Sequence, residues 1–237
     1  MTTRHPALLR LLTLVLAVVL GGGLSACSGS GSSGKPSATP SQRLATAKKQ
    51  LDTTSGVRIG LSTPRLPSGV SGLLSATGTG THAPAFDGTI KVSASGVTAD
   101  AAVVAVGGTV YAKLPFTTKF AQIDPADYNA PDPSRLLSKD GGISSLLTAA
   151  TGVKQGKQVR DGKVVLTSFT GRLPGTAVAR VIPSASPSAT FDARFTLDDG
   201  DTLSEAVLSG PFYPKADDVT YTITFSRYGT SKDITAP

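Results

Sequence analysis

The sequence is poor in the side chains that most often carry catalysis or hold metal ions. Its 237 residues include one cysteine, Cys27, and two histidines, His5 and His82, with one methionine and no tryptophan. These counts exclude a zinc site of cysteine and histidine, a disulfide framework, a CxxC redox motif and a Cys–His nucleophilic pair. We therefore expect no enzyme activity, no metal site and no cofactor.

Charged and aromatic side chains are also scarce. Charged residues make up 16% and aromatic residues 5% of the chain, while 39% is hydrophobic, which is too apolar for a disordered protein. The formal net charge is +7, but the basic residues are scattered singly and form no stripe with aromatic ones. Nucleic acid is therefore not an expected partner. The positive balance instead favours anionic headgroups at a membrane surface.

The first 26 residues are predicted to be a signal peptide. Arg4, His5 and Arg10 precede an apolar run, Leu11–Leu20, of about ten residues. Spanning a bilayer takes about 20 apolar residues, so this run is too short for a membrane helix and has the length of a signal-peptide core.

The peptide Leu24-Ser25-Ala26-Cys27 resembles the bacterial lipobox, in which the cysteine is diacylglycerated and becomes the mature N-terminus. The alternative is an ordinary secretory peptide cut after Ala26. Acyl chains such as palmitate would anchor Cys27 on the extracytoplasmic (periplasmic) face of the cell membrane, since each buried CH₂ contributes about 0.8 kcal/mol. Residues 27–42 are predicted to hold this cysteine and a flexible Ser/Gly tether, and residues 43–237 to form one domain.

Apolar periodicity within the domain indicates one helix followed mainly by strands. Helical spacing predicts a helix over residues 41–53, with Ser41 as its N-terminal cap. Later segments alternate apolar and polar residues, most clearly in Val219–Ser226, which places alternate side chains on opposite faces of a sheet.

Turn signals separate several of these strands. Asp161-Gly162 and Asp198–Asp201 each lie between two strand-like runs and predict hairpins. Further short helices are expected within residues 133–150 and 174–182. With about ten strands and three short helices, the expected class is α+β with an antiparallel sheet.

Three polar motifs have a structural explanation. Gly152–Gln158 is one residue short of a phosphate-binding loop and ends in glutamine, so we interpret it as a turn. The acidic cluster Asp198–Asp201 lies between strands and lacks the spacing of a calcium loop, so a charged hairpin turn is expected. His82 lies in a Gly-rich, Pro-bounded segment and is interpreted as a surface imidazole in a loop.

Many apolar strand positions carry small side chains. A sheet lined by such residues encloses volume that they do not fill, and an apolar void either costs stability or holds an apolar ligand. A sheet packed by helices around an ordinary core remains an equal alternative from composition alone. The small residues concerned are Ala94, Ala101, Ala102, Val103, Ala105, Val106, Gly107 and Gly108.

Several segments resemble the LppX/LprAFG family of mycobacterial and other actinobacterial lipoproteins. They are the lipobox and tether, DGTIKVSASG, VVAVGGTVYAKLP, VRDGKVVLTSFTG and the closing SRYGTSKDITAP. The most specific part is Tyr111–Leu147, which contains FAQIDPADYNAPDPSRLLSKDGGISSLL. The family often carries a tryptophan shortly before the DP-rich loop, where this chain has Phe120.

The resemblance implies an antiparallel half-barrel sheet with helices on its concave face and an apolar cavity between the two layers. It also implies acylated envelope lipids as partners, such as triacylglycerol, phosphatidylinositol mannosides, lipoglycans or phthiocerol-type waxes. Such proteins assist the outward movement of these lipids across the periplasm, in some cases beside a major-facilitator exporter.

The resemblance places Ile90, in the strand matching DGTIKV, at the mouth of this cavity. The expected lipid-cavity residues are Ile90, Val92, Val104, Val106, Val110, Leu146 and Leu147. Two further functions stay open: a tethered structural or adhesive lipoprotein with a filled core, and a receptor for polar solutes or peptides. The receptor would need buried charges and aromatic stacking faces, which the sequence does not suggest.

Overall fold

A computed structural model describes residues 38–94, 96–128 and 130–237 of the chain. The predicted signal peptide, Cys27 and most of the tether lie outside these residues and stay predictions. No helix among the described residues is long and apolar enough to cross a membrane.

The first described element is the helix α1 (Pro40–Thr53). The backbone N–H of Thr39 donates to Gln42 Oε1 at 2.8 Å, and the N–H of Gln42 donates to Thr39 Oγ1 at 3.3 Å, which is a capping box. Pro40 suits the first helical position because it has no N–H to leave unsatisfied. Ser41 is therefore not the cap, and residues 40–42, which were assigned to the tether, belong to the helix.

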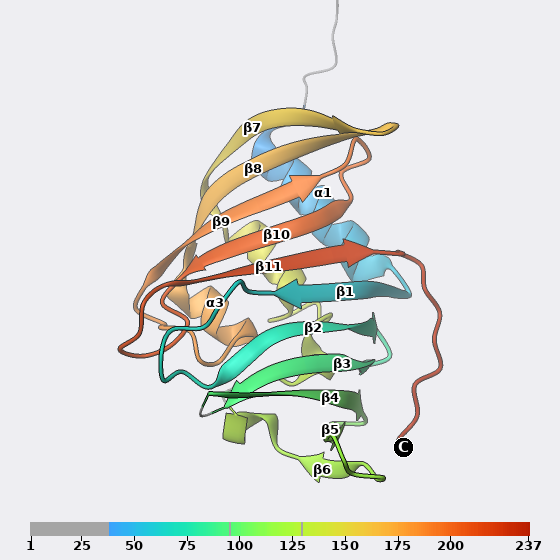
Figure 1. Ribbon diagram of the computed structural model, residues 1–237. Helices are drawn as coiled ribbons and strands as arrows, with labels where there is room; N and C mark the ends of the chain where they lie inside the picture. The colour runs from blue at the N-terminus through green and yellow to red at the C-terminus, as the bar shows by residue number, and fades with distance from the viewer. Residues whose placement is uncertain (1–37, 95, 129) are drawn as a thin grey trace, which may run out of the picture. The chain divides into compact units, whose positions relative to one another are not determined.

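Eleven antiparallel strands form one open sheet, with β6 and β7 as its edges. Their order across the sheet is β6-β5-β4-β3-β2-β1-β11-β10-β9-β8-β7, so the first strand lies beside the last (Figure 1). The strands are β1 (Gly56–Ser62), β2 (Gly72–Thr81), β3 (Ala85–Ala94), β4 (Val97–Val106), β5 (Thr109–Lys113), β6 (Ala121–Ile123), β7 (Thr151–Asp161), β8 (Val164–Pro174), β9 (Thr190–Leu197), β10 (Leu203–Gly210) and β11 (Val219–Ser226).

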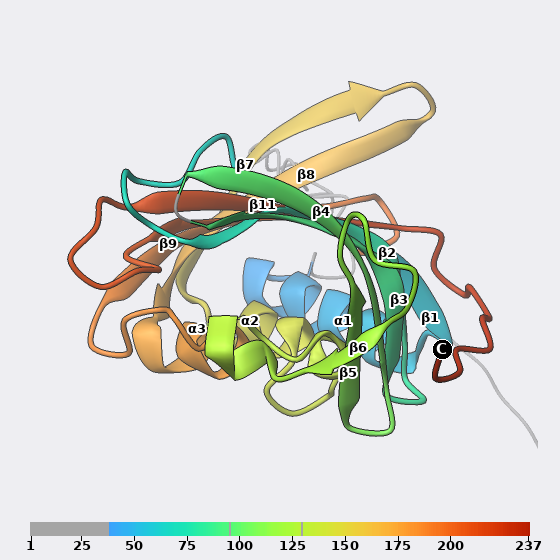
Figure 2. The same ribbon diagram turned by 60° about the horizontal axis from the view of Figure 1, so that its bottom comes forward.

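The remaining helical elements lie within the segments predicted for them, or just before. They are the 3₁₀ turns η1 (Pro125–Tyr128) and η2 (Pro133–Arg135) and the helices α2 (Ile143–Ala149) and α3 (Gly175–Val181). The sheet curves over α1, α2 and α3, which all lie on its concave side (Figure 2). The predicted α+β half-barrel is confirmed, with eleven strands instead of about ten.

The main hydrophobic core lies between these helices and strands β1 and β8–β11. Leu44 and Leu51 of α1 and Leu146 of α2 are at most 1% exposed and contribute its helical side. Phe169 and Phe195, in β8 and β9, are equally buried on the side of the sheet. This half of the concave face is therefore fully packed.

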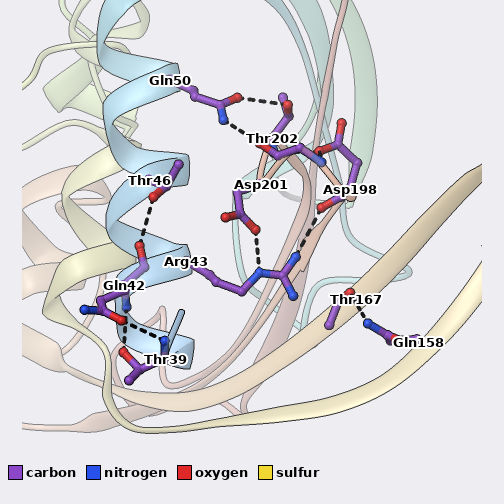
Figure 3. A network of polar contacts seen from close by, with 11 residues as sticks. Thr39, Gln42, Arg43, Thr46, Gln50, Gln158, Thr167, Asp198, Asp201 and Thr202 are labelled. Atoms are coloured by element: carbon purple, nitrogen blue, oxygen red, sulfur yellow. Dashed lines mark hydrogen bonds and ion pairs between the residues drawn. The ribbon is translucent and has the colours of Figure 1, made fainter. Parts of the chain in front are cut away.

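A polar network ties α1 to the turn between β9 and β10 (Figure 3). Arg43 Nε donates to Asp201 Oδ1 at 2.5 Å, and Arg43 Nη2 donates to the backbone oxygen of Asp198 at 3.3 Å. The hydroxyl of Thr202 donates to Gln50 Oε1 at 2.9 Å. These bonds hold the helix across the end of the sheet.

Both predicted hairpins are present, and the acidic cluster is a turn as expected. Asp198 Oδ1 accepts the N–H groups of Gly200 and Thr202 at 2.9 and 2.7 Å, which closes the β9–β10 connection. The described residues contain no group of three or more His, Cys, Asp or Glu placed to hold a metal ion. Gly152–Gln158, by contrast, is not a turn but part of strand β7, whose bulges interrupt its pairing with β8.

His82 is bound into the fold more firmly than the sequence suggested. It lies in the turn between β2 and β3 and is half-buried. Its Nε2 lies 2.9 Å from the backbone oxygen of Leu51, near the end of α1. The imidazole therefore links the helix to the sheet, and it is not a free surface group.

Candidate functional site

Strand register identifies the side chains that face the helices in the N-terminal half of the sheet. Residues directly opposite each other in neighbouring antiparallel strands point to the same face. Ile59 of β1 belongs to the main core, and it lies opposite Gly78 of β2, which lies opposite Gly88 of β3. In β3 the same face carries Phe86 and Ile90, two residues away on either side.

A second, smaller hydrophobic cluster occupies this half of the concave face. It consists of Phe86, Val103, Ala105, Val110 and Ala112, with the partly buried Ile90 and Ile123 packed against it. The turn η2 contacts β2, β3 and β4. The concave face thus has two apolar regions, the main core beneath the helices and this second cluster in β3–β5.

Three glycines, Gly78, Gly80 and Gly88, lie on the concave face where the two regions meet, and we call them the glycine stripe. A β-carbon on Gly78 would stand 2.3 Å from Phe86 Cζ, and one on Gly88 would stand 2.9 Å from the same atom. A β-carbon on Gly80 would stand 3.2 Å from Leu137 Cδ1. The stripe is therefore covered by two large side chains, the ring of Phe86 and the isobutyl group of Leu137.

The structure brings three of the seven expected cavity residues to this concave face of β3–β5. Ile90 packs against the second cluster and Val110 belongs to it, with Val110 5% exposed. Val92 follows Ile90 by two positions in β3 and is also half-buried. The alternation of these residues with the exposed Lys91 matches the sequence pattern.

Val104 and Val106 lie on the opposite, convex face. They are paired with Asp87 and Ala85, one position out of phase with the inward Phe86. Together with Ile234 of the C-terminal tail they form a separate apolar group. These two valines therefore cannot line the same wall as Ile90.

Leu146 and Leu147 belong to the helical side of the main core. They are 1% and 2% exposed and lie on α2. Both leucines are fully packed in that core.

Two pockets among the described residues lie elsewhere. One, of about 330 Å³, is bordered by Asp132, Arg135, Asp140 and Arg180, and so mixes charges of both signs between the η2–α2 segment and α3. The other, of about 270 Å³, is bordered by polar residues of β8–β10 such as Thr170 and Ser209. Neither is lined by the glycine stripe or by Ile90.

One end of the concave face is tied across the sheet by two tyrosines. The hydroxyl of Tyr221 donates to the backbone oxygen of Leu73 at 2.9 Å, and it lies 2.8 Å from the hydroxyl of Tyr213. Leu73 is paired with Val92, so this link holds β2 where the half-buried wall residues lie. Burial, together with the bond to Tyr213, raises the pKa of Tyr221 well above its usual range.

The sequence reasoning missed the glycine stripe and the two side chains that cover it. A signal was present in β2, where Gly78 and Gly80 alternate with Thr77, Thr79 and Thr81. Glycine in the interior of a strand often marks a close approach of another group. The identity of that group, Phe86 or Leu137, depends on strand register and on the path of the η2–α2 segment.

An open antiparallel sheet that curves over helices is also the architecture of two mycobacterial lipoproteins. The crystal structure of LprF from Mycobacterium bovis matches with a TM-score of 0.67 at 16% identity, covering 84% of this chain and 96% of that one. The lipoprotein LppX of Mycobacterium tuberculosis matches with a TM-score of 0.61 at 14% identity, covering 83% and 98%. At these identities the likeness defines the fold.

The sequence comparison defines the family. Residues 39–235 match the LppX_LprAFG lipoprotein family, and the chain belongs to it. No curated protein matches the chain as a relative. Family membership makes the protein an envelope-associated lipoprotein.

Proposed function

We propose that this protein is a membrane-anchored carrier that binds acylated lipids on the concave face of its sheet and assists their transport across the periplasm. The observation that carries the proposal is the glycine stripe, a strip of backbone without side chains of its own between two apolar regions. The side chains of Phe86 and Leu137 lie over Gly78 and Gly80. Rotation of these two side chains would leave an apolar channel floored by glycine, which suits an acyl chain.

Half-buried apolar residues beside the glycine stripe are the proposed opening of this channel. Ile90 and Val92 face the helical side without being covered completely. An acyl chain that lay along them would gain about 25 cal/mol for each Å² of apolar surface removed from water. The Ile90 end of the second cluster is therefore the proposed point of entry.

The cargo classes follow from the family resemblance: triacylglycerol, phosphatidylinositol mannosides, lipoglycans or phthiocerol-type waxes. Binding of an acyl chain needs no bond-making, metal or cofactor. The proposed anchor is acylated Cys27 on the periplasmic face of the cell membrane, and a major-facilitator exporter is a proposed partner in delivery.

A second candidate is a tethered structural or adhesive lipoprotein without cargo. It is favoured by the dense packing of the main core and by the position of the two pockets away from the stripe. The two candidates differ in whether the purified protein holds lipid.

The deciding experiment is mass spectrometry of organic extracts of the full chain carrying Cys27→Ala, which removes the acylated cysteine. We expect acylated lipid in near-stoichiometric amount, and rebinding of that lipid after delipidation. A secreted protein of similar size from the same cells is the control. Lipid at the level of this control, with no rebinding, would favour the structural role.

A further inference from the structure

The loop between β5 and β6, residues 114–120, holds two large apolar side chains in solvent. Phe116 is fully exposed and Leu114 is 54% exposed. Exposed apolar side chains that lie close together mark surfaces that bind a partner or a membrane.

The backbone of this loop presents Phe116 at a conformational cost. The carbonyl of Leu114 accepts the N–H of Thr117 at 3.2 Å and its hydroxyl at 2.8 Å, so Pro115 and Phe116 are the central residues of a β-turn. Phe116 has φ +68°, a conformation that favours glycine at this turn position. The backbone of Phe116 is strained, and its side chain is not buried in the protein. Folding stability therefore does not explain a phenylalanine at this position.

Positive charge flanks the apolar tip. Lys113 comes directly before the loop and Lys119 lies near its end, and the segment 113–120 contains no acidic residue. Both lysines are exposed, and Lys113 Nζ lies 5.9 Å from the centre of the Phe120 ring. An apolar tip between lysines is complementary to the boundary between anionic headgroups and acyl chains.

The loop also adjoins the proposed lipid site. The last pair of β5 and β6 before the loop is Ala112 with Ala121. Ala112 and Val110 of β5 belong to the second cluster, and Ile123 of β6 packs against it. The strands that carry this wall therefore end at the exposed tip.

We propose that residues 114–120 insert Phe116 and Leu114 into the surface of a bilayer that contains anionic lipids. The insertion would hold the second cluster beside the membrane from which cargo enters or leaves. This inference rests on the proposed function, because a lipid carrier has to exchange its cargo with a bilayer.

The chain contains no tryptophan, so one introduced indole reports on this loop alone. We would prepare Phe116→Trp in the full chain with Cys27→Ala and add phosphatidylcholine vesicles with or without phosphatidylglycerol. We expect a blue shift of the emission, and quenching by lipids brominated on their acyl chains, when phosphatidylglycerol is present. Val159→Trp is the matched control, since Val159 is 60% exposed on β7 at the other edge of the sheet, and it should not shift.

Measuring the partition of further variants into vesicles separates the contribution of the apolar side chains to membrane binding from that of the lysines. We expect Phe116→Ser to weaken partition about tenfold or more, since the phenyl ring no longer leaves water. Lys113→Gln and Lys119→Gln should each weaken it roughly fivefold and reduce its salt dependence. Leu114→Ser should act in the same direction as Phe116→Ser.

Three results would overturn the insertion. They are an emission from Phe116→Trp that vesicles leave unchanged, an equal shift from Val159→Trp, and a shift that depends on protein concentration without vesicles. A shift that depends on protein concentration without vesicles would mean that residues 114–120 contact another protein molecule instead of a membrane. Lipid content measured on the same preparations distinguishes the two proposals. Bound lipid without membrane insertion would refute only the insertion of the loop. Insertion without bound lipid would refute only the proposed function as a lipid carrier.

Discussion

The ring of Phe86 lies over Gly78 of the neighbouring strand, where a β-carbon would stand 2.3 Å from Phe86 Cζ. Phe86 is 3% exposed and belongs to the second cluster. Any other residue at position 78 would displace the ring. The pair therefore explains both why β2 has glycine here and how this part of the concave face is filled.

Phe86→Ala should open the stripe. Truncating a buried phenylalanine costs about 3–5 kcal/mol, part of which is the cavity left behind. We expect this loss in urea unfolding, together with tighter binding of a long-chain fluorescent fatty acid. Phe195→Ala is the control, because Phe195 is 1% exposed in the main core. An equal gain in affinity from both variants would argue against the stripe as the binding channel.

Ile90→Trp and Val104→Trp test the two faces of the same pair of strands. The half-buried Ile90 should accept the indole with the free energy of unfolding changed by less than about 1 kcal/mol, while bound lipid falls. Val104, which is 8% exposed beneath Ile234, should be overpacked at a cost of about 1–3 kcal/mol. Melting temperatures and extracted lipid would be measured side by side. A large loss of stability with Ile90→Trp, or unchanged lipid content, would contradict a lipid wall at Ile90.

The buried tyrosines predict a loss of stability in alkali. Burial raises the pKa of Tyr221 and of Tyr228 well above the ordinary value of 10. Above pH 10 the unfolded chain therefore loses protons that the folded chain keeps, and stability falls as pH rises, by up to about 1.4 kcal/mol per pH unit for each tyrosine.

Urea unfolding between pH 9 and 11 would measure this slope. Tyr228→Phe removes one ionisable group and also the bond of its hydroxyl to the backbone oxygen of Leu203. This variant should be less stable at neutral pH and show a shallower decline above pH 10. An unchanged slope would mean that Tyr228 ionises alike in both states.

Cys27→Ala should release the protein from the membrane. The anchor prediction depends on Leu24-Ser25-Ala26-Cys27, and without the thiol no acyl chain can be attached. We expect the variant in the soluble fraction, with labelling by palmitate abolished. Cys27→Ser is the companion variant, since it too lacks the thiol. Membrane retention of both variants would contradict the lipoprotein anchor.

Local patterns in the sequence were sufficient to predict most helices and strands of this fold. The alternation in Val219–Ser226 gave strand β11, and the turn residues Asp161-Gly162 gave the β7–β8 hairpin. The inward direction of Ile90 and Val92 was also predictable, because polar residues separate them in β3. In each case the information lies within a few residues of the element itself.

In the neighbouring strand β4, the local sequence does not predict which side chains face the helices. Its segment Ala101–Val106 is apolar at every position, so a period of two cannot distinguish one face from the other. Pairing with β3 turns Val103 toward the helices and Val104 away from them. The convex position is apolar because Ile234, more than a hundred residues later in the chain, covers it.

The sequence by itself determined the class of fold and the order of its elements, since side-chain period and turn chemistry act over short distances. The tertiary structure alone decided which face of β4 meets the helices, and that Phe86 and Leu137 cover the glycine stripe. These outcomes depend on strand register and on contacts between distant segments. No local pattern encodes such contacts, because each is chosen by the packing of the whole sheet.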